Sequence, residues 1–220
     1  MLKEISKYLP VILSGTFMTF KLFVLTLIIS LPLGLPITIG AKSKIGPIRW
    51  FCNFYILIFR GTPLMLQLFF FYFFLPINLG IKMNVFTTAS LTFALNYAAY
   101  FAEIYRGGID SIDRGQYEAA HSLQLSKSQT LFDIILPQAM KAIFPSIMNE
   151  MITLVKDTAL VQALGMMELM KVTYGIVNAT STTWMFLVSG IIYLAMTTIL
   201  TLLASRLEKY FNRYDRKGDN

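Results

Sequence analysis

The sequence has few charges, one cysteine and one histidine, and each shortage excludes a class of protein. Charged residues make up 14% of its 220 residues, against about 25% in soluble domains. The single cysteine, Cys52, rules out an internal disulfide. The single histidine, His121, has no partners at ligand spacing, which argues against a bound metal. No glycine-rich phosphate loop ending in Gly-Lys-Ser/Thr occurs, so the chain is not itself an ATPase.

What the sequence does have is long apolar runs, with 55% hydrophobic residues and a mean hydropathy of +0.60. A helix that crosses a hydrocarbon core of about 30 Å needs about 20 residues. Only helices and closed barrels satisfy their backbone in lipid, and these runs exceed the roughly 10-residue strands of a barrel. We therefore predict an all-α membrane protein with five transmembrane helices. The expected spans are residues 14–41, 51–79, 85–105, 137–155 and 183–207.

The length predicts one transmembrane domain over residues 1–220. Residues 1–12 alternate charged and apolar positions at helical spacing, so we expect a short helix in the membrane interface. The first apolar run lacks a small-residue cleavage pattern and is expected to remain as the insertion signal. Prolines inside the spans have two interpretations. Either they kink the helices so as to open a cavity or form hinges, or they reflect only the higher frequency of proline in membrane helices. They are Pro32, Pro36, Pro63 and Pro145.

The basic residues favour an orientation with the N-terminus outside and the C-terminus inside. Five spans put the termini on opposite sides, and the inside is normally richer in Lys and Arg. In this orientation the inside holds Lys42, Lys44, Arg49, Arg106, Arg114, Lys127, Arg206, Lys209, Arg213, Arg216 and Lys217, and the outside holds Lys3, Lys7, Lys82, Lys156 and Lys171. Residues 106–136 then form a cytoplasmic loop and residues 208–220 a basic cytoplasmic tail. Because the net charge of +7 is spread over loops and tail, we expect no nucleic acid partner.

The polar insert between the third and fourth spans predicts two short helices. Residues 113–116 (DRGQ) and 126–129 (SKSQ) each fit a capping box, which places helix starts at Arg114 and Lys127. A break is expected near Leu125. Tyr117, Ala120, Leu123 and Leu125 are expected on or near one face of the first helix. A plain surface linker would also fit the two boxes.

The insert resembles the EAA loop of permease subunits of ATP-binding-cassette (ABC) importers. That pattern is Glu-Ala-Ala, three residues, Gly, nine residues, Ile, one residue and Leu-Pro. This sequence has Glu118-Ala119-Ala120, then Gln124 at the glycine position, then Ile134 and Leu136-Pro137 at the same spacing. Residues 59–64 (FRGTPL), 99–109 (AYFAEIYRGGI) and 156–160 (KDTAL) are similar to signatures of the polar amino acid permeases, and the resemblance covers about residues 15–208.

The resemblance implies a division of labour. Two permease subunits, a homodimer or heterodimer, form the amino acid pathway in the bacterial inner membrane. A dimer of ABC ATPases binds below them and holds ATP and Mg, and an extracytoplasmic binding protein delivers the amino acid. This chain would then be non-catalytic and hold no cofactor. The expected ATPase-coupling residues are Tyr117, Glu118, Ala119, Ala120, Leu123, Gln124 and Leu125.

Ionisable and amide side chains inside spans are the other candidates for a site. Glu150, beside Asn149, lies about 20 Å into the fourth span at 1.5 Å per residue, where a charge is costly and commonly functional. Either it faces the pathway and meets the amino acid, or it makes a structural hydrogen bond. Gln67 and Asn96 fit ligand contact and helix–helix bonding equally.

A second group of candidates is structural or gating. Glu103 and Arg106 are three residues apart, so they share a helix face and favour a local ion pair. Arg60 is expected to anchor the interface or pair with an acid, and Pro63 to break the second span.

Two other classes remain as alternatives. A small stand-alone secondary carrier or channel would show an inverted repeat or a pore-lining carbonyl signature. An intramembrane enzyme would show clustered His, Asp or Glu at membrane depth. The sequence shows neither feature.

Overall fold

The computed structural model describes the backbone of residues 2–211 and the side chains of residues 6–209. Within that part of the chain all regular structure is helical. The long helices are α1 (Leu2–Ala41), α2 (Gly46–Gly61), α5 (Val85–Asp110), α8 (Leu136–Asp157) and α10 (Met185–Phe211). Shorter helices are α3 (Leu64–Phe69), α4 (Leu75–Leu79), α6 (Arg114–Ser122), α7 (Lys127–Gln129) and α9 (Leu169–Thr180). Three further segments continue these helices: the π-helical Phe70–Phe74 follows α3, the π-helical Thr130–Ile135 follows α7, and the 3-10 helix Thr158–Leu164 follows α8.

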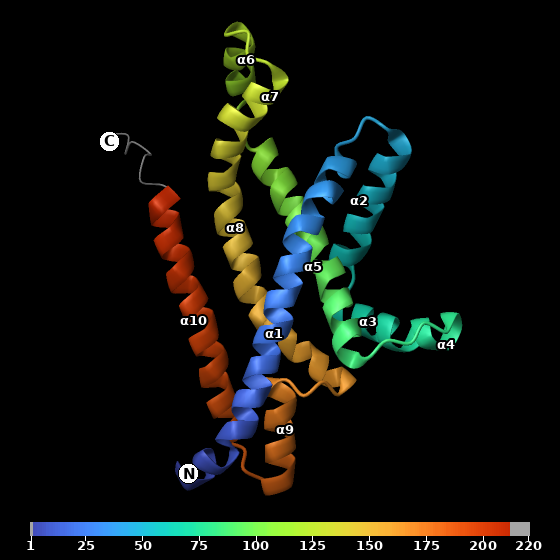
Figure 1. Cartoon of the computed structure of the whole chain (residues 1–220), viewed down its shortest axis with the longest axis vertical. Helices are drawn as coiled ribbons and strands as arrows, with labels where there is room; N and C mark the ends of the chain where they lie inside the picture. Colours follow the sequence, from blue (N-terminus) through green and yellow to red (C-terminus); the bar gives the residue numbers. More distant parts are fainter. Residues whose placement is uncertain (1, 212–220) are drawn as a thin grey trace.

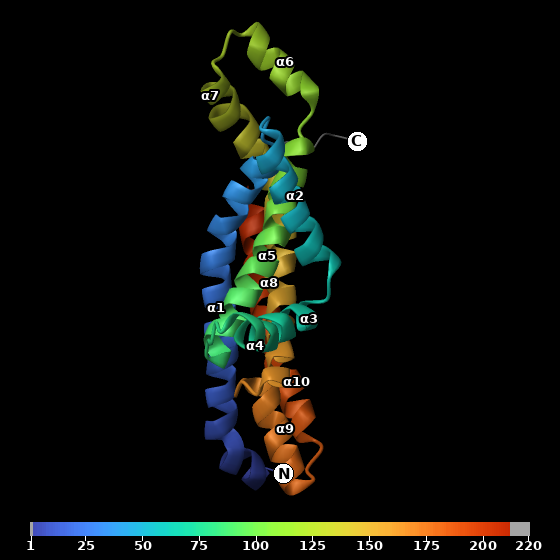
Figure 2. The ribbon, with the colours of Figure 1, turned by 90° about the vertical axis from the view of Figure 1, so that its right-hand side faces the viewer.

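The long helices run lengthwise beside one another, and α6 and α7 project from the end of the bundle opposite the N-terminus (Figure 1; Figure 2). Residues 6–41, 127–164 and 185–209 are long and apolar enough to cross a membrane, and α2 with α3–α4 makes a fourth candidate if the bent pair is one span. The expected third span lies in α5, which is 26 residues long but is not among these candidates. It carries the charged residues Glu103, Arg106 and Asp110 near its end. The exact number of five spans therefore stays a prediction.

The second expected span is bent by 107° between Gly61 and Leu64, where the sequence predicted a break at Pro63. Thr62 is extended (φ −117°, ψ 147°) and precedes Pro63, as expected because a proline disfavours the α conformation of the residue before it. Proline also removes the backbone donor that would continue α2. Helices α3 and α4 consequently run across the bundle (Figure 2).

Residues 2–12 belong to the same helix as the first span, and Pro10 lies inside it. Ile12 is buried and packs in a cluster with Leu169 and Val172 of α9. The interfacial position expected for residues 1–12 stays a prediction. The predicted tail, residues 208–220, falls mostly outside the described residues.

The core forms where α1 packs along α5. A Cβ added to Gly34 would lie 3.0 Å from the Cβ of Phe101 and 3.2 Å from the backbone nitrogen of Ala102. Small residues permit such close helix approach in membranes. Polar bonds join the same pair: the Thr38 hydroxyl donates to the Ala102 carbonyl at 2.9 Å, and the Tyr105 hydroxyl donates to the Leu31 carbonyl at 3.0 Å. The α1–α5 pair is thus the frame against which the α2–α3 bend and α8 are placed.

Candidate functional site

A cavity of about 430 Å³ lies where the α2–α3 bend meets α5 and α8. The bend contributes Arg60, Gly61, Thr62, Pro63 and Leu64, α5 contributes Asn96, Tyr97 and Tyr100, and α8 contributes Glu150, Thr153 and Asp157. The sequence candidates Arg60, Pro63, Asn96 and Glu150 therefore come together. Asn149 and Gln67 do not line this cavity.

The charged side chains of this cavity are one cation and two carboxylates. Glu150 and Asp157 are seven residues apart, two turns of α8, so they project on the same side of that helix. The Tyr97 hydroxyl donates a hydrogen bond to Asp157 Oδ2 at 2.8 Å. The Arg60 guanidinium lies over the Tyr100 ring, 5.4 Å from its centre. Such a cavity offers partners to both an ammonium and a carboxylate.

Two buried amides hold the bend in place. The Gln67 side-chain nitrogen donates to the Phe59 carbonyl at 2.9 Å and to the Thr62 carbonyl at 3.1 Å. The Asn96 side-chain nitrogen donates to the Phe59 carbonyl and to Gln67 Oε1, both at 2.9 Å. These bonds satisfy carbonyls that the end of α2 leaves without helical partners. Gln67 and Asn96 thus join helices here, one of the two roles that their sequence positions predicted.

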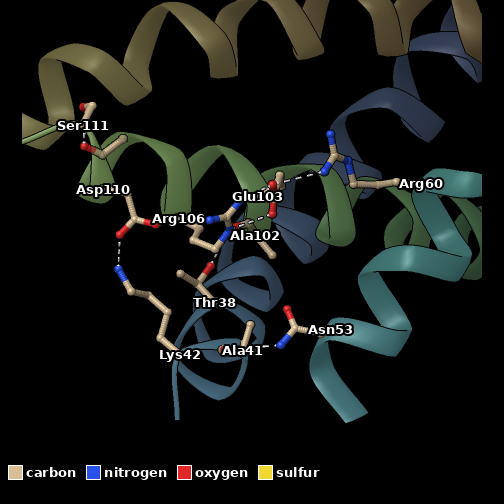
Figure 3. A network of polar contacts seen from close by, with 11 residues as sticks. Thr38, Ala41, Lys42, Asn53, Arg60, Ala102, Glu103, Arg106, Asp110 and Ser111 are labelled. Atoms are coloured by element: carbon tan, nitrogen blue, oxygen red, sulfur yellow. Dashed lines mark hydrogen bonds and ion pairs between the residues drawn. The ribbon is translucent and has the colours of Figure 1, made fainter. Parts of the chain in front are cut away.

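An ion-pair network extends from this cavity along α5 (Figure 3). Arg106 Nε donates to Glu103 Oε2 at 3.0 Å, so the local ion pair expected from the sequence is present. Arg60 Nη1 lies 3.5 Å from Glu103 Oε1. Arg106 Nη1 reaches Asp110 Oδ2 at 3.2 Å, and Lys42 at the end of α1 pairs with Asp110.

The two short helices of the polar insert begin at the predicted residues, Arg114 and Lys127. The second capping box is complete: Gln129 N donates to Ser126 Oγ at 3.2 Å, and Ser126 N donates to Gln129 Oε1 at 3.0 Å. The first box is wrong in detail, because Asp113 accepts from Gly115 N at 2.6 Å. The Gln116 side chain instead accepts from the Gln138 amide at 3.1 Å, which joins α6 to α8.

The predicted shared face of α6 is wrong for Leu123 and Leu125, which both lie outside the helix. Ala120 is fully buried, whereas Leu123 is 71% exposed. Leu123 lies past the last helical residue, Ser122, so helical spacing no longer describes it. Tyr117, at 41% exposed, and the exposed Glu118 remain available on the projecting loop.

Gln124 is the left-handed residue of a Schellman motif. Its φ is +54°. Leu125 N donates to the Ala120 carbonyl at 3.0 Å, and Gln124 N donates to the His121 carbonyl at 2.9 Å, which is the bonding that defines this helix ending. Glycine is favoured here because it has no Cβ to strain, so the glycine of the EAA pattern has a conformational reason.

We expect Gln124→Gly to stabilise the loop by about 1 kcal/mol, the cost of a left-handed conformation for a residue with a Cβ. Local stability is read as slower amide hydrogen exchange over residues 119–125 in the purified chain. Gln124→Ala is the matched control, because it removes the same side chain but keeps the Cβ. Equal protection in the two variants would contradict the strain at this position.

Two acidic residues with clear structural partners were not singled out from the sequence. Asp157 lies in the KDTAL segment, whose likeness to the permeases gave no role to any single residue. Glu168 is fully buried and begins α9: it accepts from Met170 N at 2.8 Å, from Lys171 N at 2.6 Å and from the Tyr193 hydroxyl at 2.9 Å. Burial raises the pKa of the Glu168 carboxyl, and these hydrogen bonds oppose the rise. The sequence signal that could have identified Glu168 is an acidic residue just before an apolar helix, where its side chain can accept hydrogen bonds from the first backbone N–H groups.

Comparisons with known proteins agree on one family. A family model described as binding-protein-dependent transport system inner membrane component matches residues 30–213. A Rickettsia typhi protein whose name assigns it to a glutamine transport system, permease GlnP, is 40% identical over 95% of this chain and 98% of its own length. The arginine transport system permease ArtQ of Bacillus subtilis is 39% identical over 94% and 95% of the two chains.

Solved structures give the same result for the fold. A chain of an amino acid ABC transporter crystallised with histidines has a TM-score of 0.90 at 35% identity, over 96% of this chain and 98% of that one. An inward-facing MetNI methionine ABC transporter has a TM-score of 0.72 at 18% identity, over 93% and 98% of the two chains, which supports the fold alone.

Proposed function

The chain belongs to the binding-protein-dependent transport system inner membrane components, as a permease subunit of an amino acid ABC importer, and we propose that its pathway includes the cavity of Arg60, Glu150 and Asp157. It has the type I ABC permease fold and is a multi-pass inner membrane protein. It is a non-catalytic subunit, since the ATPase of such an importer is a separate chain. ATP and Mg therefore belong to that partner.

The observation that carries the proposal is the charge set around the 430 Å³ cavity. A free amino acid carries an ammonium and a carboxylate. Glu150 and Asp157 offer charge-assisted bonds to the ammonium, and Arg60 offers a planar guanidinium suited to a carboxylate. One carboxylate in excess of the cation favours substrates whose side chain is cationic or an amide donor. The names of the relatives, glutamine and arginine permeases, fit that class.

We propose that the projecting loop docks on the ATPase. Leu123 and Tyr117 expose apolar surface at its tip, beside the exposed Glu118. Aromatic and apolar anchors of this kind commonly carry the affinity of a protein interface. ATP-driven closure of an ATPase dimer would then move α8 together with α6, because the Gln138 amide of α8 donates to Gln116 of α6.

This docking requires the loop, residues 106–136, to be cytoplasmic and the N-terminus to be outside. We propose five spans: α1, the bent α2–α4, α5, α8 and α10. In α5 the charges that lower its hydropathy are paired with each other and with Lys42 and Arg60. A second permease subunit, identical or related, and an extracytoplasmic binding protein at the opposite end complete the proposed assembly.

The test is uptake by proteoliposomes that contain this chain with its ATPase and binding protein. We expect uptake of glutamine, arginine or histidine that requires ATP and all components. Chain-only vesicles under an ion gradient are the control. Uptake by the chain alone without ATP would overturn the proposal and favour a stand-alone carrier.

A further inference from the structure

A second, larger cavity continues from the first one toward the end of α5. Its volume is about 680 Å³, and it shares Arg60, Gly61 and Tyr100 with the first cavity. Its remaining polar lining is the ion-pair network with one amide: Lys42, Asn53, Glu103, Arg106 and Asp110. Figure 3 shows these side chains directed into the space between α1, α2 and α5. Arg60 therefore borders both cavities.

The two cavities differ in the charges that line them. The first has Arg60 against the two carboxylates of α8, which leaves one negative charge in excess. In the second, Lys42 and Arg106 balance Glu103 and Asp110, and the charge of Arg60 is shared with the first cavity. A free ammonium is attracted to the first cavity, and a free carboxylate is attracted to the three cations that border the second.

The ion pairs of the second cavity are open to exchange. Its five charged side chains are between 26% and 44% exposed, so water reaches the pairs. Arg106 holds Glu103 through two bonds, Nε to Oε2 and Nη2 to Oε1, and the other pairs rest on single contacts. Arg60 and Glu103 are 3.5 Å apart, longer than a good charge-assisted hydrogen bond. An incoming carboxylate can replace Glu103 on Arg60, or Asp110 on Arg106, without leaving a desolvated charge behind.

We infer that this second cavity is a separate binding site for the α-carboxylate of an amino acid. The inference rests on the proposed function, because the ligand would arrive from the first cavity. Arg60 binds the carboxylate of the amino acid in the first cavity. It keeps contact with that carboxylate when Arg106 and Lys42 bind it in the second cavity. Binding there requires the carboxylate, whereas binding in the first cavity depends on the ammonium.

The test is equilibrium dialysis of the permease–ATPase complex with radiolabelled glutamine or arginine and with their decarboxylated analogues, 4-aminobutanamide and agmatine. We expect two classes of site for the amino acid and one class for its analogue. Raising the salt concentration should weaken the second class more, because its pairs are solvent-exposed.

Variants separate this inference from the proposed function. Lys42→Met is expected to weaken the second class about threefold and Arg106→Gln about tenfold, with the first class unchanged. Lys44→Met is the matched control, since this exposed lysine lies two residues away and does not line the cavity. A single class of site, or a second class that both variants leave unchanged, would overturn the inference. If Glu150→Gln weakens neither class of binding, the proposed function is overturned instead.

Discussion

The double variant Glu150→Gln with Asp157→Asn is expected to lower ATP-driven amino acid uptake at least about a hundredfold. Both residues line the cavity of Arg60, and the two amides would leave a substrate ammonium facing a cation with no carboxylate beside it. A hydrogen bond to a charged group contributes about 1.5–3 kcal/mol, and about 1.4 kcal/mol is a factor of ten. Each single variant should therefore cost roughly tenfold.

The measurement is initial uptake in proteoliposomes, with the unfolding midpoint of each purified variant recorded beside it. Asp157→Asn keeps an oxygen that accepts from the Tyr97 hydroxyl, so we expect the fold to persist. Glu208→Gln, near the end of α10 and outside the cavity, is the matched control and should transport normally. Unchanged uptake and unchanged amino acid preference in the double variant would leave Glu150 with a structural role only.

Glu118→Lys is expected to weaken association with the ATPase by at least about 2 kcal/mol, the lower end for truncating one partner of a buried charge pair at an interface. Glu118 is exposed on α6 of the projecting loop, so its reversal should leave insertion and folding intact. Association is measured as the fraction of ATPase that co-purifies with the tagged permease from membranes.

The control for this variant is Glu208→Lys, the same charge reversal at the end of α10. Its yield of ATPase should equal that of the unmodified chain. Normal co-purification with Glu118→Lys would show that the docking surface lies elsewhere on the chain.

Local features were predictable because they depend on neighbours in the chain. Ser126 and Gln129 satisfy each other's backbone donors within one turn, so the start of the second short helix could be predicted at Lys127. Gln116 has the same sequence context but bonds Gln138, 22 residues away, and no local pattern predicts that choice. Leu123 was assigned to a helix face because its spacing is helical, yet the chain has already left the helix there.

The acidic residues of the candidate site likewise divide into those that a local pattern predicts and those that depend on distant contacts. Glu150 could be singled out because a carboxylate in an apolar run is costly wherever the run ends up in the fold. Asp157 lines the cavity only because Tyr97 of α5 and the α2–α3 bend approach it. Glu168 likewise depends on Tyr193, 25 residues further along the chain.

By itself the sequence determined a helical membrane protein with two short helices in its polar insert, since apolar length and capping residues are local properties, and the resemblance of its motifs to the EAA permeases indicated the family. Only the tertiary structure decided which charges share a cavity. The 107° bend after α2 brings Arg60 between the carboxylates of α8 and the ion pairs of α5. Its position depends on amides from α3 and α5 that bond the same carbonyl, Phe59. Pairings between distant segments are set by packing across the whole fold, and local patterns along the chain do not reveal them.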